Sequence, residues 1–140
     1  MSLDLSLGGL PLVLLVDPSL TSRHWMWRAL NRAFGVIEAG SARAARDWLA
    51  RRPDIDALVV DNELPDERGY DLVCDLASAH HPAAARAIVL ARMSPEWARF
   101  AEAGTTLVER GDLRAVVSKL SGWFFARDAA ARSSSIHQRF

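Results

Sequence analysis

The stretch PDIDALVVDNELPDERGYDL, residues 53–72, decides the fold of this 140-residue chain. Residues 57–60 form an apolar run that ends on Asp61, and such a run predicts a strand covered on both faces. A polar loop containing proline and glycine follows, and residues 70–79 predict a helix. A buried strand, a loop and a helix in this order are the building unit of a parallel α/β sheet.

The same unit recurs on both sides of this stretch. Further strands are predicted over residues 12–16, 36–38, 87–90 and 106–108, and further helices over 20–33, from Ser41 to before Pro53, from Pro95 to before Gly104, and from Asp112 through Phe124. Ser19, Ser41, Ser94 and Asp112 are predicted to be helix caps. Five alternating strands and helices predict a flavodoxin-like, doubly wound (βα)5 fold with a parallel sheet in the order 2-1-3-4-5.

One domain over residues 11–126 is expected, after an N-terminal extension of residues 1–10. Residues 127–140 show no usable periodicity and are predicted to be a flexible C-terminal tail. Whether the chain is a fragment of a longer protein stays open. The apolar run at residues 10–16 is too short to span a bilayer, and the single cysteine, Cys74, cannot form an internal disulfide. A cytoplasmic location is therefore expected.

The charge balance argues against nucleic acid or membrane as a partner. Seventeen basic and seventeen acidic side chains cancel, so no overall positive field attracts phosphate groups. No glycine-rich loop follows the first strand and the four histidines show no ligand spacing, which argues against a nucleotide-binding enzyme.

Two aspartates, Asp17 and Asp61, end the predicted first and third strands. These strands flank the point where the strand order reverses, so the two carboxylates should lie close together. At an effective dielectric near 20 they would repel by roughly 4 kcal/mol, which a hard cation such as Mg²⁺ would relieve. Alternatively, either aspartate only caps a following turn or helix.

Residues 53–72, together with Leu14-Leu15-Val16-Asp17 and Ala103-Gly104, resemble the response-regulator receiver family of bacterial two-component signalling. The likeness extends over about residues 11–126. It implies that Asp61 is the phospho-acceptor position, and that Asp17, Asp61 and the backbone carbonyl of Glu63 are the protein ligands of Mg²⁺.

The chain departs from that family pattern at the positions that bind metal and read out a phosphate. Pro18 stands where receivers have a second acid, Ala91 where they have Thr or Ser, and Thr106 where they have an aromatic switch residue. At the position of the usual lysine the sequence offers Glu109 or, with a shift of one residue, Arg110. If Glu109 faces the pocket, a third carboxylate replaces the cation and repels an incoming phosphoryl group. Arg92 would then be an internal counter-ion to Asp61 or Glu109, or else it points into solvent.

Four aromatic side chains are candidates for a partner surface. Trp25 and Trp27 on the first predicted helix, and Trp123 and Phe125 on the last, flank the expected core stripes. They form a partner or homodimer interface in one interpretation, and wide helix flanks buried within the monomer in the other.

The leading hypothesis is an atypical, or pseudo-receiver, domain that acts through protein–protein interaction. Its phosphorylation and Mg²⁺ binding would be weak or absent, and it would not be an enzyme beyond autocatalytic phosphoryl transfer to Asp61. A histidine kinase, a phosphotransfer protein or a downstream regulator would be its partner. The alternative is a conventional Mg²⁺-dependent, single-domain response regulator of a phosphorelay, with Asp61 as nucleophile.

Overall fold

A computed structural model describes residues 9–102 and 105–137 of the chain. The five strands form one parallel sheet in the order β2-β1-β3-β4-β5, which confirms the predicted doubly wound topology. The strands are β1 (Leu12–Val16), β2 (Gly35–Ala39), β3 (Ala57–Asp61), β4 (Ala87–Ala91) and β5 (Thr106–Glu109). The helices are α1 (Leu20–Leu30), α2 (Ala42–Arg51), α3 (Gly69–Ser78), α4 (Glu96–Glu102) and α5 (Leu113–His137), with a short 3-10 helix η1 (Pro82–Arg86).

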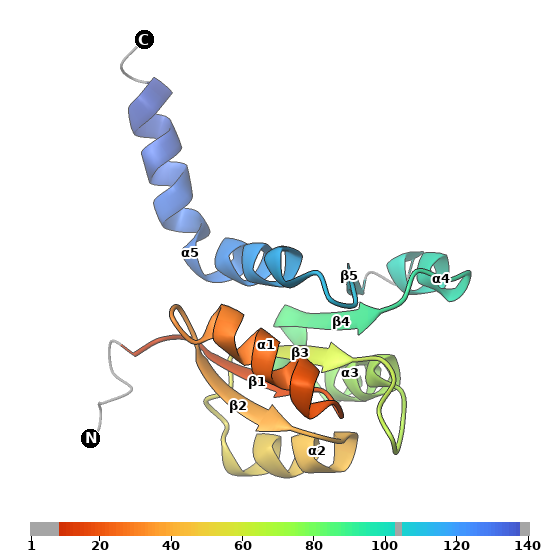
Figure 1. Cartoon of the computed structure of the whole chain (residues 1–140). Coiled ribbons are helices and arrows are strands. Elements are labelled where there is room, and N and C mark those ends of the chain that lie inside the picture. Colours follow the sequence, from red (N-terminus) through yellow and green to blue (C-terminus); the bar gives the residue numbers. More distant parts are fainter. Residues whose placement is uncertain (1–8, 103–104, 138–140) are drawn as a thin grey trace.

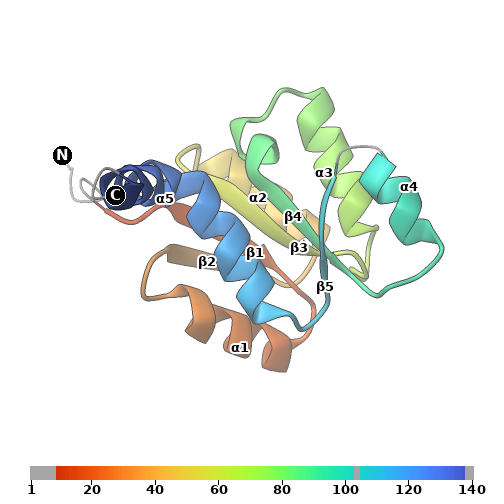
Figure 2. The same cartoon turned by 90° about the horizontal axis from the view of Figure 1, so that it is seen from above.

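The sheet is the middle layer of three (Figures 1 and 2). Side chains alternate across each strand, so Leu14 and Val60 face one layer while Leu15 and Val59 face the other. Helices α2, α3 and η1 cover the first face, and α1 and α5 cover the second. Both faces are therefore apolar and closed, which is why the strands read as uninterrupted hydrophobic runs.

Three of the predicted caps are made by the expected side chains. The hydroxyls of Ser19 and Ser41 accept hydrogen bonds from the amides of Ser22 and Ala44, at 3.2 and 3.1 Å. The Asp112 carboxylate accepts from the Ala115 amide at 3.0 Å. These bonds satisfy amides at the start of α1, α2 and α5, and they fix where each helix leaves the carboxyl edge of the sheet.

Two element boundaries differ from the prediction. α1 ends at Leu30 rather than at Ala33, because the chain turns there and places Phe34, 1% exposed, in the core. Helix α5 continues to His137, beyond residue 127 where the tail is predicted to begin, and the flexibility of that segment stays a prediction. The alanine-rich sequence there has a high helix propensity, and that part of α5 extends away from the sheet (Figure 1).

Some sequence predictions lie outside the described residues. These are most of the N-terminal extension (residues 1–8), the end of the tail (138–140), and the Ala103-Gly104 pair. Among the residues that are described, no helix combines the length and the apolar character that crossing a bilayer requires.

Candidate functional site

Asp17 and Asp61 lie next to each other at the carboxyl edge of the sheet. The strands that precede them are hydrogen-bonded neighbours, with Val16 paired to Val60. Both aspartates are only 4% exposed, and they are the buried charged residues of the described chain. The structure thus brings together the two acids that the sequence pattern places at the switch point of the strand order.

Each carboxylate also caps the turn that follows it. Asp17 Oδ1 accepts a hydrogen bond from the Ser19 amide at 2.8 Å, and Asp61 Oδ1 accepts from the Glu63 amide at 2.7 Å. Burial raises the pKa of Asp17 above its ordinary value, against the Ser19 hydrogen bond, and the nearby Asp61 charge raises it further. The capping alternative and the acidic-pair interpretation therefore both describe real features of the same two side chains.

Arg110 supplies the cation of the site. Its Nη2 lies 2.5 Å from Asp61 Oδ1, and its Nη1 lies 3.4 Å from Glu63 Oε1. Its backbone amide donates to the Ala91 carbonyl at 3.0 Å. This hydrogen bond holds Arg110 at the carboxyl ends of β4 and β5. Of the two candidates for the usual lysine position, Arg110 is the one whose side chain contacts the acid.

Glu109 is placed differently from the interpretation that put it in the pocket. It is exposed, and its carboxylate accepts a hydrogen bond from the Met93 amide at 2.9 Å. Neighbouring residues of a strand point to opposite sides, so Glu109 and Arg110 cannot both face the acids. The predicted third carboxylate is therefore absent from the pocket, and the repulsion argument built on it fails.

Of the two interpretations of Arg92, the internal counter-ion is wrong. Arg92 is exposed at the start of the loop after β4, and within the described part of the chain its guanidinium has no ion pair. The alternative interpretation, an arginine that points into solvent, holds. The internal counter-ion of Asp61 is instead Arg110, which directly follows the carboxyl end of β5.

Of the other altered positions, Pro18 and Ala91 lie at the carboxyl edge near the acids, whereas Thr106 lies at the opposite end of β5. Ala91 is 6% exposed at the end of β4, and its methyl group offers no hydrogen bond to a neighbour. Pro18 is exposed directly after Asp17, and Thr106 is half-buried at the start of β5. None of the three supplies an acid or a hydroxyl at the carboxyl edge beside Asp61.

These residues do not fit a Mg²⁺ ion well. Among the described residues, no group of three or more His, Cys, Asp or Glu side chains is arranged to hold a metal. One oxygen of Asp61 is already bound to the Arg110 guanidinium and the Glu63 amide. Mg²⁺ requires near-octahedral oxygen ligands, and a guanidinium beside the carboxylate competes with it through like charge.

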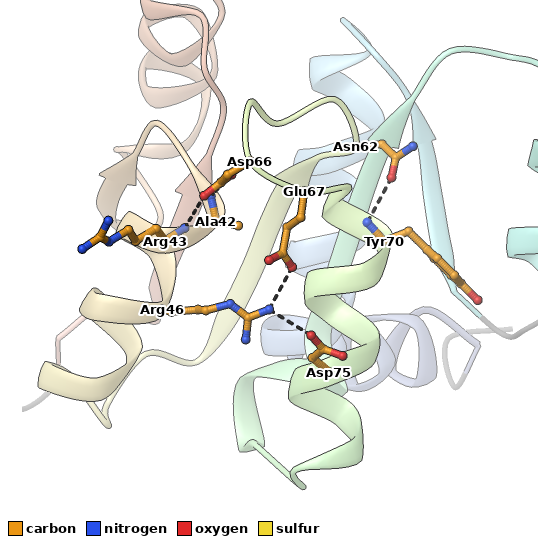
Figure 3. A network of polar contacts seen from close by, with 8 residues as sticks. All are labelled: Ala42, Arg43, Arg46, Asn62, Asp66, Glu67, Tyr70 and Asp75. Atoms are coloured by element: carbon orange, nitrogen blue, oxygen red, sulfur yellow. Dashed lines mark hydrogen bonds and ion pairs between the residues drawn. The ribbon is translucent and has the colours of Figure 1, made fainter.

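The loop between β3 and α3 is anchored to α2 (Figure 3). The Asp66 carboxylate accepts hydrogen bonds from the amides of Ala42 and Arg43 at 3.0 and 2.9 Å, and thereby caps α2 from a distant part of the chain. These two bonds lower the pKa of Asp66. Sequence reasoning missed this contact because the partners are 24 and 23 residues apart.

A second contact completes the same anchor. Arg46 Nη2 lies 2.8 Å from Glu67 Oε1 and 3.0 Å from Asp75 Oδ2, so one guanidinium joins α2 to the loop and to α3 (Figure 3). The Asn62 side chain accepts from the Tyr70 amide at 3.0 Å. The loop that carries Glu63 is thus held at both ends, which fixes the position of Glu63 beside Arg110.

Gly69 is required where α3 begins. A Cβ atom there would lie 2.3 Å from the carbonyl oxygen of Asp61 and 2.7 Å from a methyl carbon of Val60. Both neighbours belong to the central strand, so neither can move without disturbing the site. The glycine that the sequence pattern places in this loop serves the close approach of α3 to Asp61.

The four aromatic residues separate into two pairs. Trp25 and Trp27 on α1 are 53% and 38% exposed. Trp123 and Phe125 on α5 are half-buried and pack against the core, with the Phe125 ring 5.7 Å from that of Phe34. The idea that all four form one exposed patch is therefore wrong, because Trp123 and Phe125 pack against the core while Trp25 and Trp27 do not.

Comparison with known proteins gives a consistent picture at the level of fold. No family model and no curated protein matches the sequence. A response regulator receiver protein from Pseudomonas putida is similar in structure, with a TM-score of 0.68 and 24% identity over 80% of this chain and 96% of that one. The signal receiver domain of an HD domain-containing protein from Pseudomonas fluorescens Pf-5 gives 0.67 and 20% identity over 93% of both chains.

A third similar structure is the complex of CheX and CheY with BeF3 and Mg²⁺ from Borrelia burgdorferi, with a TM-score of 0.69 and 19% identity over 84% of this chain and 92% of that one. At these identities the likeness shows the fold. The chain has the doubly wound fold of CheY-like receiver domains, with two buried aspartates and an arginine at its carboxyl edge.

Proposed function

We propose that this chain is an atypical receiver domain of bacterial two-component signalling, which acts through protein–protein contacts with little or no phosphorylation. The observation that carries the proposal is the ion pair between Arg110 and Asp61. The carboxylate of Asp61 is buried, and its Oδ1 accepts hydrogen bonds from both the Arg110 guanidinium and the Glu63 amide, which stabilise its negative charge and make it a weaker nucleophile.

The energetic cost of freeing Asp61 supports this proposal. A hydrogen bond between charged groups contributes about 1.5–3 kcal/mol, so breaking the Arg110 contact would slow attack by roughly tenfold to a hundredfold. Ala91 offers no hydroxyl to a phosphoryl oxygen, and Pro18 offers no metal ligand. Phosphoryl transfer depends on such electrostatic groups, so their loss weakens both the reaction and its product.

The alternative function, a conventional response regulator, has one observation in its favour. Arg110 is a cation at the place where the receiver family has lysine, and its charge would neutralise a phosphoryl group on Asp61. Weak binding of Mg²⁺ by Asp17 and Asp61 would then assist the reaction. A partner in signalling is proposed in both cases: a histidine kinase, a phosphotransfer protein or a downstream regulator, or a second copy of this chain.

Intact mass after incubation with acetyl phosphate and Mg²⁺ separates the two functions. The native chain is expected to show no phosphoryl adduct. The variant Pro18→Asp, Ala91→Thr, Arg110→Lys, which adds an acid and a hydroxyl beside Asp61 and removes the guanidinium, is expected to gain one. A phosphoryl adduct on the native chain that disappears in Asp61→Asn would refute the proposal and establish the alternative.

A further inference from the structure

A small hollow opens beside the acids, between α1 and the loop that leads into α5. We name it the Trp25 hollow. It measures about 240 Å³, and its walls include the side chains of Trp25, Met26, Leu90 and Leu113. Asp17 and Arg110 also line it. The hollow thus combines a largely apolar wall with charged groups from the carboxyl edge of the sheet.

The Asp17 carboxylate makes no ion pair in the described part of the chain, although the Arg110 and Arg23 guanidinium groups lie close enough to stabilise its charge. Its one hydrogen bond is accepted from the Ser19 amide. Arg110 directs its terminal nitrogens to Asp61 and Glu63. A carboxylate that is 4% exposed and unpaired is costly, so a cation that reached it would be bound favourably.

Arg23, the other nearby guanidinium, does not fill this role. Its Nη1 donates to the backbone carbonyl of Asp17 at 3.1 Å, and its Nε lies 3.3 Å from Glu38 Oε1. Among the side chains that these contacts join, the carboxylates therefore outnumber the guanidinium groups. The carboxylates are Asp17, Glu38, Asp61 and Glu63, and the guanidinium groups are those of Arg23 and Arg110.

We propose that the Trp25 hollow binds a primary ammonium ion carried on a short unbranched alkyl stem, with the nitrogen on Asp17 and the stem along the apolar wall. A volume of about 240 Å³ is smaller than the sites of drug-sized ligands, which begin near 300 Å³. Trp25 is 53% exposed at the rim, and because the Arg28 guanidinium already lies 5.6 Å from the centroid of its ring, the ring contributes apolar contact to the alkyl stem. This site does not depend on whether Asp61 is phosphorylated.

Amide NMR spectra of the full chain, titrated with n-butylammonium in the presence of a chelator, test this proposal. Saturable shifts are expected at the Ser19 amide and the Trp25 indole, with a dissociation constant on the order of 1 mM. n-Butanol and butyrate are the neutral and anionic controls. Nα-acetyl-lysine methylamide, which carries a lysine side chain, is titrated in parallel. Tighter binding of this compound than of n-butylammonium indicates a lysine side chain as the source of the ammonium group, and weaker binding indicates a free amine.

Two variants and a matched control locate the site. Asp17→Asn keeps an oxygen for the Ser19 amide but removes the charge, and should weaken binding at least about tenfold. Trp25→Ala should weaken it about twofold to fivefold, whereas Trp27→Ala, an exposed tryptophan of the same helix outside the hollow, should not change it. Equal binding of n-butanol or butyrate, or unchanged binding by Asp17→Asn, would overturn the proposal.

Discussion

Replacing Arg110 by alanine removes the cation that pairs with Asp61. Asp61 is 4% exposed, so water cannot fully replace the contact that its carboxylate loses. Arg110 is 26% exposed, so part of its charge stays hydrated in the folded chain, which limits the loss of stability when it is removed. Asp61 keeps its hydrogen bond from the Glu63 amide. From these contacts we expect the free energy of unfolding to fall by about 2 kcal/mol at pH 7, near the middle of the range for charge-assisted hydrogen bonds.

Urea unfolding followed by tryptophan fluorescence measures this change, and a thermal scan should show a melting temperature lower by roughly 8 °C. Arg92→Ala is the matched control, because Arg92 is exposed at the same edge and should alter stability by less than about 0.5 kcal/mol. In an Asp61→Asn background the cost of Arg110→Ala should shrink to a similar value. A full cost in that background, or an equal effect of the two arginine substitutions, would refute the ion pair as the cause.

Further predictions concern the anchor and the glycine beside the site. Asp66→Ala should cost about 0.5–2 kcal/mol at neutral pH, as the loss of a helix cap does. Because folding lowers the pKa of Asp66, this contribution is fully present above pH 3.8 and is lost as the pH falls below that value. The unfolding curves of the native chain and of Asp66→Ala should therefore converge in acid. Gly69→Ala should destabilise the folded chain by about 3 kcal/mol or more, since its Cβ would meet the Asp61 carbonyl. Gly122→Ala, with open space around it, should stabilise the folded chain by about 0.5–1 kcal/mol. A similar effect of both glycine substitutions in chemical denaturation would contradict the close approach at Gly69.

Most of the fold follows from local patterns in the sequence. The apolar runs that end on Asp17 and Asp61 identify β1 and β3, since a strand buried on both faces has no polar position until it reaches the sheet edge. The caps Ser19, Ser41 and Asp112 mark helix starts, because a side-chain oxygen there satisfies a free amide within three residues. The end of α5 escaped prediction because alanine-rich residues form helix without a periodic apolar stripe.

The site was only partly accessible to the same reasoning. Asp17 and Asp61 could be placed together, because the order of parallel strands fixes which ends are neighbours. The choice between Glu109 and Arg110 could not be made, because it depends on where β5 ends. A shift of one residue reverses which side chain faces the acids. The positions of Trp123 and Phe125 likewise depended on Phe34, which enters the core from a turn.

The sequence by itself determined the class of fold and the pair of aspartates at its carboxyl edge. These features depend on residue type and on spacing within one strand or helix. Only the tertiary structure decided that Arg110 holds Asp61, that Asp66 and Arg46 anchor the loop of Glu63, and that Asp17 and Arg110 both line the Trp25 hollow. The physical reason is that each of these contacts joins segments far apart in the chain, and their geometry exists only after the sheet and its helices have packed.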